Sequence, residues 1–379
     1  MNIDELRAWL PVTWEAVYLN TGWAGPCPEP VLRRVAEALE EETRLGPASA
    51  KGLAFVRSTA EAARVAIAAL IGANPQDVRP TSSTTEGVNI VVHGLDWQPG
   101  DGLVICDLEH PALTVPAELL EAQRGVVVER VTVPPAASGA EVLEGITAAL
   151  GPRTRLVALS HIEYNGLRMP VKEIAEAAHL RDVPVLLDGA QTVGQIPVDV
   201  QDLDCDFYAL SGQKWLMGPL GTGALYVRPD RLQLLTPPYT TRELELAFHE
   251  IGPLGEFEVA SQSPGLLAGF TEAVRLITET GPEVIERRVM GLADLLRQRI
   301  ASMAGATLIS PSHPESVCGL VTVRFDGWNP VELVALLEER FGIVARDLRY
   351  PEGVRFTTAY FNTEDEIERV VAVLTELTA

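Results

Sequence analysis

Lysine is nearly absent from this chain of 379 residues. Only three of its 30 basic residues are lysines, namely Lys51, Lys172 and Lys214. Arginine carries the rest of the positive charge, and its guanidinium is never a neutral amine nucleophile. Any chemistry that needs a side-chain amine therefore has three candidates.

Cysteine is also scarce. The four cysteines lie far apart in the sequence, and none belongs to a C-x-x-C pair. This spacing argues against a disulfide framework and against a structural zinc site, and it fits a reducing cytoplasm. The chain also has no basic N-terminal segment followed by an apolar run, and no stretch of roughly 18 uncharged apolar residues. We therefore expect a cytoplasmic protein with neither a secretory signal nor a membrane span.

Positive charge is outweighed by negative charge. With 30 basic and 52 acidic residues, the formal net charge is −22. Such a surface repels phosphate backbones and anionic lipid, so we expect no nucleic-acid partner and no membrane partner.

Apolar runs that resemble strands alternate with amphipathic helices over most of the chain. The runs cover 103–108, 126–133, 156–160, 183–188, 205–210 and 223–228, and the helices between them cover 114–123, 141–150 and 171–180. Continuous apolar strands separated by helices predict an α/β fold whose mostly parallel sheet is covered on both faces.

The pattern changes after residue 263. Two helices near 264–279 and 283–303 precede strands at 319–325, 343–347 and 354–359 and helices at 330–339 and 363–378. We expect a large domain over 16–262 and a smaller α+β domain over 263–379, with residues 1–15 packed on the smaller one.

Local signals refine this outline. Residues 58–61 (STAE) form a capping-box pattern that predicts a helix start, Gly72 predicts the end of that helix, and Lys51 is expected in a polar turn. Residues 231–262 are rich in turn signals and predict a long irregular segment that shapes the functional site.

Lys214 is the favoured amine. It follows the predicted strand 205–210 within SGQKWLMGP, where apolar neighbours disfavour the ammonium form and lower the pKa of the amine. Lys172, by contrast, opens an ordinary amphipathic helix. The alternative is that Lys214 is a solvated loop residue.

Asp188 ends another apolar strand, in VPVLLDGAQ. In open α/β sheets, ligands bind at the carboxyl ends of strands, so a carboxylate followed by Gly189 can approach a ligand closely. The alternative is an N-cap aspartate.

Two further segments stand at predicted strand or helix boundaries. Residues 81–89 (TSSTTEGVN) place hydroxyls and backbone amides at a helix start, which is typical of an anion site, and simple capping by Thr84 or Thr85 is the alternative. His110, in DLEHPAL, can stack on a flat ring or serve as a capping residue.

In chain order these features are an anion site, a ring-stacking histidine, an aspartate and a lysine. The pattern D-G-A-Q…S-G-x-K-W-x-x-G-P resembles the class V aminotransferase family, which includes the cysteine desulfurases. The resemblance extends from YLNTGWAGP (18–26) to AYFNTEDEI (359–367). It implies pyridoxal 5′-phosphate (PLP) bound as a Schiff base, and fold type I with a seven-stranded sheet.

The resemblance also assigns roles to individual residues. Lys214 would form the Schiff base, Asp188 would face the pyridine nitrogen, Gln191 would bind the ring hydroxyl, and His110 would stack on the ring. The residues that would contact the phosphate are Thr84, Thr85, Ser211, Gln213 and Ser261. Ser261 resembles a position that reaches the site of the neighbouring subunit, which implies a homodimer. Gln213 departs from the family, which usually has histidine there, and its effect on cofactor affinity stays open.

Three more residues are expected to bind substrate. Arg355 resembles the family's carboxylate-binding arginine, and a planar guanidinium suits bidentate binding; a surface arginine on an edge strand is the alternative. Asn165 resembles a position near the cofactor hydroxyl and the substrate. His161 either lines the pocket or is a structural residue at a strand end. No metal is expected.

The reaction is less constrained than the family. Cysteine desulfurases carry a cysteine on a loop before the carboxylate-binding arginine, but here that stretch is ARDLRYPEGVR, which has none. Stretches such as DLEHP and FEVAS are most similar to bacterial cysteine/cystine C–S lyases, and isopenicillin N epimerase-like proteins are also similar. We therefore expect β-elimination from a sulfur amino acid, with transamination or epimerisation as alternatives. Because Lys214 and Asp188 are both present, a non-catalytic relative is disfavoured.

Overall fold

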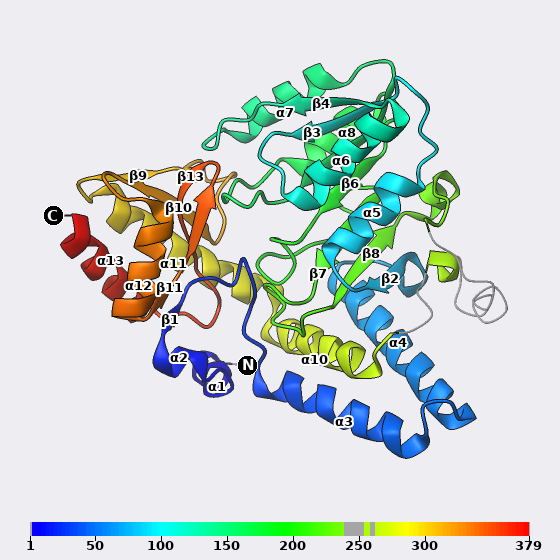
Figure 1. Ribbon diagram of the computed structural model, residues 1–379, viewed down its shortest axis with the longest axis horizontal. Helices are drawn as coiled ribbons and strands as arrows, with labels where there is room; N and C mark the ends of the chain where they lie inside the picture. The colour runs from blue at the N-terminus through cyan, green and yellow to red at the C-terminus, as the bar shows by residue number, and fades with distance from the viewer. Residues whose placement is uncertain (1, 239–253, 258–261, 379) are drawn as a thin grey trace.

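The computed structural model describes every residue except 1, 239–253, 258–261 and 379. Its centre is a seven-stranded sheet with helices on both faces (Figure 1). The strands lie in the order β2 (Val78–Thr81), β8 (Gly223–Val227), β7 (Phe207–Ser211), β6 (Val185–Asp188), β5 (Thr154–Ser160), β3 (Gly102–Cys106) and β4 (Val127–Val131). Only β8 runs against its neighbours. The predicted α/β fold with a mostly parallel, seven-stranded sheet is confirmed.

Successive side chains of the central strands point to opposite faces of the sheet, and this alternation builds two apolar layers. Leu186 and Ala209 face one side with α5 (Thr84–Gly94) and α6 (Pro111–Arg124). Leu187 and Tyr208 face the other side. That side is covered by α4 (Ala50–Leu70), α7 (Gly139–Ala149), α8 (Val171–His179) and α10 (Pro264–Thr280). Both faces of the sheet are therefore dry, and polar chemistry is confined to the ends of the strands.

A second sheet forms a smaller lobe, drawn in yellow to red in Figure 1. Its antiparallel strands lie in the order β12 (Arg346–Arg349), β13 (Glu352–Thr357), β10 (Leu320–Phe325) and β9 (Ala306–Leu308). The helices α11 (Pro282–Ala301), α12 (Pro330–Phe341) and α13 (Glu364–Thr378) accompany it and share a separate apolar cluster. This is the α+β architecture expected for the C-terminal part.

The N-terminal segment joins the two parts. β1 (Val17–Tyr18) pairs in parallel with β11 (Ile343–Val344). Before it, α1 (Ile3–Ala8) and α2 (Val12–Glu15) approach the C-terminal lobe through Arg7. The Arg7 guanidinium forms a 2.8 Å ion pair with Glu366 and donates to the Phe361 carbonyl oxygen at 2.8 Å. α3 (Glu29–Leu45) then packs with α4 and α10 along the edge of the molecule. The domain boundary at residues 262 and 263 stays a prediction.

The helix start predicted at residue 58 is wrong. α4 begins at Ala50 with Ser49 as its N-cap, and the Ser58 hydroxyl donates back to the Phe55 carbonyl oxygen inside the helix. Lys51 accordingly lies in the first turn of α4 and not in a polar turn. The helix-forming residues Ala50, Leu53 and Ala54 carry the helix upstream of the apparent capping box. Gly72 does follow the end of the helix, with φ 68°.

Strand β2 has no counterpart among the runs read from the sequence, since VRPT contains an arginine and a proline. The predicted irregular segment 231–262 lies largely outside the described residues. The part of it that is described includes the short 3-10 helix Gly255–Phe257. Among the described residues, no helix combines the length and the apolarity that a membrane crossing requires.

Candidate active site

One edge of the central sheet gathers the predicted site residues. Parallel strands β3, β5, β6 and β7 end there. Asp188 is the last residue of β6, and His110, His161 and Lys214 follow the ends of β3, β5 and β7 respectively. Asp188 is in register with Ser160 of β5 and with Ala209 of β7. The topology thus brings four segments that are distant in the sequence to one place, as expected for the carboxyl ends of strands.

Lys214 and Asp188 act on each other's ionisation. Burial lowers the pKa of the Lys214 amine to about 8, and the Asp188 carboxylate opposes this shift. Asp188 is itself buried, which raises the pKa of its carboxyl group, while the positive charge of Lys214 opposes that rise. The Asp188 Oδ1 atom accepts a 2.8 Å hydrogen bond from the Ala190 amide, and no helix begins there, so the N-cap alternative is wrong.

Two glycines of the N-terminal segment allow the chain to pass close to this site. A Cβ atom on Gly25 would collide with the Lys214 carbonyl oxygen, and one on Gly22 would lie 3.2 Å from Arg355 Nη2. The Gly22 carbonyl oxygen accepts a 2.7 Å hydrogen bond from Gln191 Nε2. The segment therefore contacts Lys214, Gln191 and Arg355 together, which gives the motif GWAG a structural reason.

Two of the buried hydroxyls that lack partners among the described residues lie at the adjoining ends of β7 and α5. Thr84 Oγ1 and Ser211 Oγ have no hydrogen bond there. Ser211 is in register with Gly223, and Gly223 is in register with Thr81, so the first turn of α5 lies beside the end of β7. Unsatisfied hydroxyls are costly when buried. Together with the free amides of a helix start they fit a phosphate group.

The helix cap itself differs from the expectation. Ser83, and neither Thr84 nor Thr85, caps α5, since its hydroxyl accepts a hydrogen bond from the Glu86 amide at 3.2 Å. Thr84 thereby stays available for a ligand, and Thr85 is exposed. Gln213 is half-buried, and its Oε1 atom also lacks a partner among the described residues. Ser261 lies outside the described residues.

His110 has the capping role considered for it, and its role in stacking on a ring stays a prediction. Its Nδ1 atom accepts a 3.1 Å hydrogen bond from the Ala112 amide and thereby caps α6. Partial desolvation of the ring and the positive charges of Lys214 and Arg355 lower its pKa to about 4, so the ring is neutral at pH 7. Because Nδ1 is an acceptor, the ring proton sits on Nε2. The capped ring is held still while its side chain remains exposed at the site.

His161, Asn165 and Gln191 are engaged mainly with protein groups. His161 is buried, hydrogen-bonds the Tyr208 hydroxyl at 3.1 Å, and has its pKa lowered to about 3 by burial. The Asn165 side chain donates to the Pro135 carbonyl oxygen and accepts from the Leu167 amide, both at 3.2 Å. Gln191 accepts a 3.0 Å hydrogen bond from the Trp215 indole N–H and keeps one N–H free. Their substrate and cofactor roles stay predictions.

Arg355 is buried on an inner strand, so the alternative of a surface arginine on an edge strand is wrong. Its Nη1 atom donates to the Tyr164 carbonyl oxygen at 2.8 Å. Burial and the nearby Arg346 lower its pKa to about 10. The guanidinium is thus held in place, charged at pH 7, with a second cation beside it.

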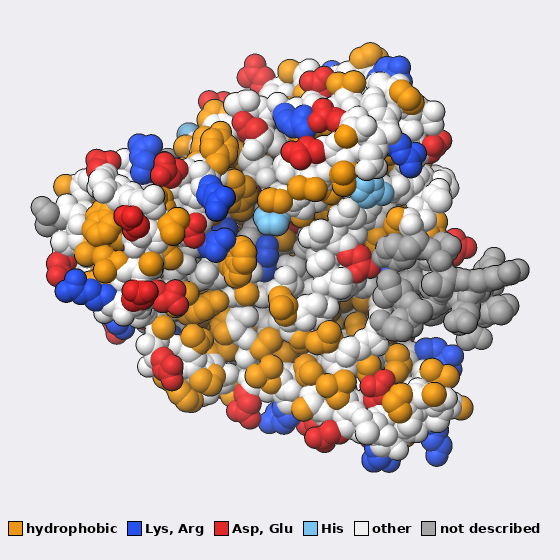
Figure 2. Space-filling view, in the orientation of Figure 1, with side chains coloured by type: hydrophobic (Ala, Val, Ile, Leu, Met, Phe, Trp, Pro, Cys, Tyr) orange, Lys and Arg blue, Asp and Glu red, His pale blue; other side chains and the backbone are white. Residues whose placement is uncertain are grey.

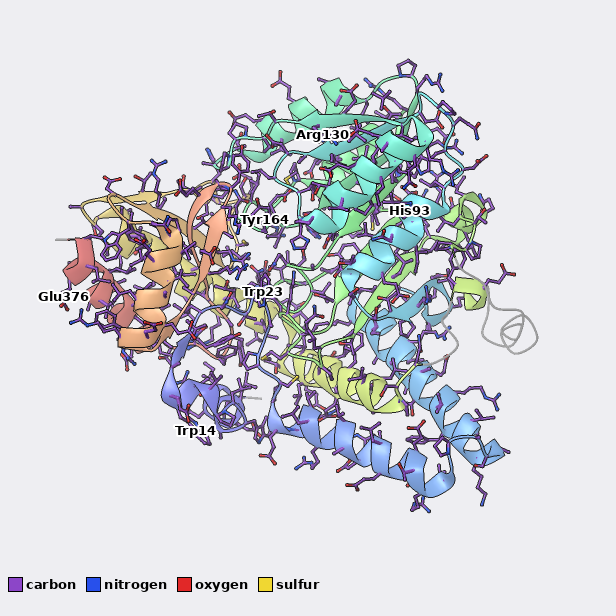
Figure 3. All side chains as sticks on the ribbon, in the orientation of Figure 1. Trp14, Trp23, His93, Arg130, Tyr164 and Glu376 are labelled. Atoms are coloured by element: carbon purple, nitrogen blue, oxygen red, sulfur yellow. The ribbon has the colours of Figure 1, made fainter. Side chains whose placement is uncertain are left out.

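Arg346 is the site residue that the sequence alone did not single out. Its guanidinium carbon lies 4.0 Å from the centre of the Trp23 ring, which is an ordinary cation–π distance. Trp23 and Tyr164 both lie between the two lobes in Figure 3. Figure 2 shows basic side chains gathered along the same junction, although the whole chain is strongly acidic. The available signal was the ARD triplet directly after β11.

Comparisons with known proteins agree with this geometry. The family model for aminotransferase class-V matches residues 17–370. Isopenicillin N epimerase of Streptomyces clavuligerus is 31% identical, with 99% of this chain and 98% of that protein covered. Cysteine desulfurase of Pectobacterium atrosepticum is 30% identical, with coverages of 98% and 97%.

A solved structure is also similar. The cystine C–S lyase C-DES in complex with its reaction product, cysteine persulfide, superposes with a TM-score of 0.89 at 28% identity, and the match covers 97% of this chain and 99% of that one. The extent of these matches establishes what the motifs indicated, and the chain belongs to the class V aminotransferase family.

Proposed function

We propose that this protein is a PLP-dependent C–S lyase that cleaves cystine or a related sulfur amino acid by β-elimination. The observation that carries the proposal is the pairing of Lys214, an amine with a pKa of about 8, with the buried carboxyl group of Asp188 at one edge of the central sheet, close to Arg355 on β13 of the smaller lobe. A solved relative is described with glycine covalently linked to its PLP cofactor, which supports this choice of cofactor.

The residues present fit the cofactor. Thr84 and Ser211 offer unsatisfied hydroxyls to a phosphate group, and neutral His110 offers a ring for stacking. When bound, the cofactor supplies an electron sink for the charge left when a proton leaves Cα. Asp188 would hold a proton on the pyridine nitrogen. Lys214 would anchor the aldehyde carbon and, once displaced by the substrate amine, move the α-proton.

Substrate binding follows from the arginines. Arg355 would grip the α-carboxylate and orient the Cα–H bond toward Lys214. Arg346 supplies a second guanidinium nearby. Two adjacent cations suit a substrate that carries two carboxylates, and cystine is such an amino acid.

The choice of β-elimination rests on what the site lacks and on one relative. The hairpin formed by β12 and β13 turns at Tyr350–Pro351 and carries no cysteine between Arg346 and Arg355. Cys106, Cys205 and Cys318 are buried. Cys27 is half-buried, and burial raises the pKa of its thiol to about 11. With no cysteine on the hairpin to take up sulfur, cleavage of the Cβ–S bond would expel the sulfur on the leaving group. The protein C-DES, which is named a cystine C–S lyase, has the same fold.

Epimerisation is the second candidate, because isopenicillin N epimerase matches nearly the full length of the chain. It shares the first step, removal of the α-proton, and differs in where the proton returns. Transamination remains a third possibility within the family.

We propose a homodimer whose sites receive Ser261 from the neighbouring subunit, as the family resemblance implies. A cytoplasmic location accords with four cysteines that form no disulfide.

The test is to incubate the holoenzyme with L-cystine and to measure pyruvate and ammonia. We expect both products in equal amounts with the wild type and with Lys172→Ala, and neither with Lys214→Ala, which also loses the visible absorbance of the bound cofactor. Racemised substrate without pyruvate would favour the epimerase, and accumulation of pyridoxamine phosphate would favour transamination. A protein that stays colourless with added PLP would refute the proposal.

A further inference from the structure

A pair of buried glutamates lies behind the candidate site. Glu109 precedes His110 and Glu163 follows His161 by two residues, and their side chains are 5% and 0% exposed. One ligand atom from each of Glu109, Glu163 and Cys106 lies within 4.8 Å of the others. The two carboxyl groups therefore meet in an environment that contains almost no water.

The two carboxyl groups have unequal partners. Glu109 accepts hydrogen bonds from the Ser160 amide at 3.0 and 3.1 Å and from the Ser160 hydroxyl at 2.6 Å. Neither carboxyl oxygen of Glu163 receives a donor from any described residue. Two carboxylates this close cannot both be ionised without a cation between them. Since Glu109 has the donors, the shared proton belongs on Glu163, which then donates to Glu109.

The pair is connected to the site on both sides. Ser160, which Glu109 holds, is in register with Asp188, and the His161 amide donates to the Asp188 carbonyl oxygen at 2.9 Å. Glu109 is also joined through the backbone to His110, whose ring caps α6. The tie between Glu109 and Ser160 thus fixes the ring-stacking histidine relative to the aspartate.

We propose that Glu109 and Glu163 are positioning residues that share one proton, and that this proton keeps the tie between the His110 segment and the Asp188 strand intact while holding the charge behind Asp188 at a single unit. This inference rests on the proposed function for its purpose, but the shared proton itself does not. Glu109 and Glu163 thereby have a role, although neither takes part directly in the proposed reaction.

The surroundings of the pair support one negative charge and not two. Within the described part of the chain, the groups that act on its ionisation are the Cys106 thiol at the end of β3, Asp107, Tyr164 and Asp188 on β6, and none of these is a cation. Burial raises the pKa of Glu109 to about 7. Burial also raises the pKa of Glu163 well above its ordinary value, and the neighbouring carboxyl groups raise that pKa further. Burial and the same acids raise the pKa of Cys106, which stays a thiol.

The first measurement is the infrared carbonyl stretch of protonated carboxylic acids in the purified protein at pH 8. We expect a band in the wild type that Glu163→Gln removes and that Glu118→Gln, an exposed control on α6, leaves unchanged. A wild type without the band, or a band that survives Glu163→Gln, would overturn the proposal. So would one equivalent of divalent metal that copurifies with the wild type and not with Glu163→Gln.

The second measurement separates positioning from packing. Glutamine keeps a donor toward Glu109, whereas Glu163→Met fills a similar volume without one. We expect Glu163→Met to weaken PLP binding by about tenfold relative to Glu163→Gln, because Glu109 loses a hydrogen bond to a charged group. We also expect the cofactor absorbance of the wild type to change at alkaline pH, where the shared proton is lost. Glu163→Gln has no such proton and should not show this change. Equal affinities for the two variants would refute the positioning role. If none of these proteins binds PLP, the proposed function fails while the infrared result still decides the shared proton.

Discussion

The guanidinium carbon of Arg346 lies 4.0 Å from the ring centre of Trp23. This contact joins strand β12 of the smaller lobe to the N-terminal segment across the junction between the two lobes. Trp23 is 56% exposed, so its ring is available to a ligand as well as to the arginine. The pair lies beside Arg355, to which the α-carboxylate of the substrate would bind.

Arg346→Ala should raise the KM for cystine more than the KM for β-chloroalanine. Cystine has a second carboxylate that Arg346 can bind, whereas β-chloroalanine has one carboxylate and a good leaving group. Loss of a charged hydrogen bond costs about 1.5–3 kcal/mol, which corresponds to roughly ten- to a hundredfold in kcat/KM for cystine. Arg340→Ala is the matched control, since Arg340 is exposed on α12 and its guanidinium carbon likewise lies near an aromatic ring, 5.8 Å from the centre of the Phe341 ring. Equal losses for both substrates would mean that Arg346 binds no distal carboxylate.

The rate at which the apoprotein takes up PLP should rise with pH up to about 8 and then level off. Only the neutral amine of Lys214 condenses with an aldehyde, and below its pKa of about 8 the neutral fraction falls roughly tenfold per pH unit. An ordinary lysine, with a pKa of 10.5, would still gain rate above pH 9. The check is the growth of cofactor absorbance in a stopped-flow instrument over a range of pH.

Asp188→Asn should move that profile to lower pH. The Asp188 carboxylate stabilises the ammonium form of Lys214 and so raises its pKa. Removing the charge leaves burial unopposed, and the plateau is then reached at lower pH. A profile that shifts upward or does not move would mean that the two groups are not coupled.

Ser211→Ala should weaken PLP binding by about ten- to a hundredfold and leave the stability of the apoprotein unchanged or slightly higher. The Ser211 hydroxyl has no partner among the described residues, so alanine removes no internal hydrogen bond but does remove a donor to phosphate. Equilibrium dialysis with PLP and thermal unfolding of the apoprotein measure the two effects. Ser58→Ala, in the middle of α4, is the control. A marked loss of apoprotein stability in Ser211→Ala would identify a structural hydroxyl.

Much of the fold could be predicted because apolar strands and helical periodicity alternate so regularly. The segments for which the prediction was wrong are informative. Strand β2 contains Arg79 and Pro80 and forms only because β8 offers it an antiparallel partner. The capping-box pattern at 58–61 was overridden by helix-forming residues on its N-terminal side. Both errors arise where long-range pairing or a neighbouring segment outweighs a local signal.

The placement of a candidate site residue could be predicted where it lies at or shortly after the end of a strand, as Asp188 and Lys214 do. Arg346 and Glu163 could not, since their importance depends on partners far away in the sequence. Trp23 is more than 300 residues from Arg346, and Glu163 meets Glu109 only because β3 and β5 are neighbours. The ARD triplet shows a charged residue after a strand, but nothing in the local sequence marks its contact with Trp23 or the contact between the two glutamates.

Asp206→Ala should destabilise the protein by about 3–5 kcal/mol, which makes it the most damaging single change predicted at the far end of the sheet. The Asp206 carboxylate is fully buried and accepts from the Val185 amide at 2.7 Å, while Arg231, His179 and Arg228 lie at 2.8, 2.8 and 3.0 Å. Its removal leaves the buried Val185 amide without its acceptor, and it leaves Arg228 and Arg231 with only more exposed carboxylates as counterions where β6 and β7 begin. Asp202→Ala is the matched control, because its 2.6 Å pair with Lys172 is exposed and should contribute only about 0–1 kcal/mol. Urea unfolding of the two variants measures the difference in the free energy of unfolding. Comparable losses of stability would show that the buried contacts of Asp206 stabilise the protein no more than the exposed ion pair of Asp202 does.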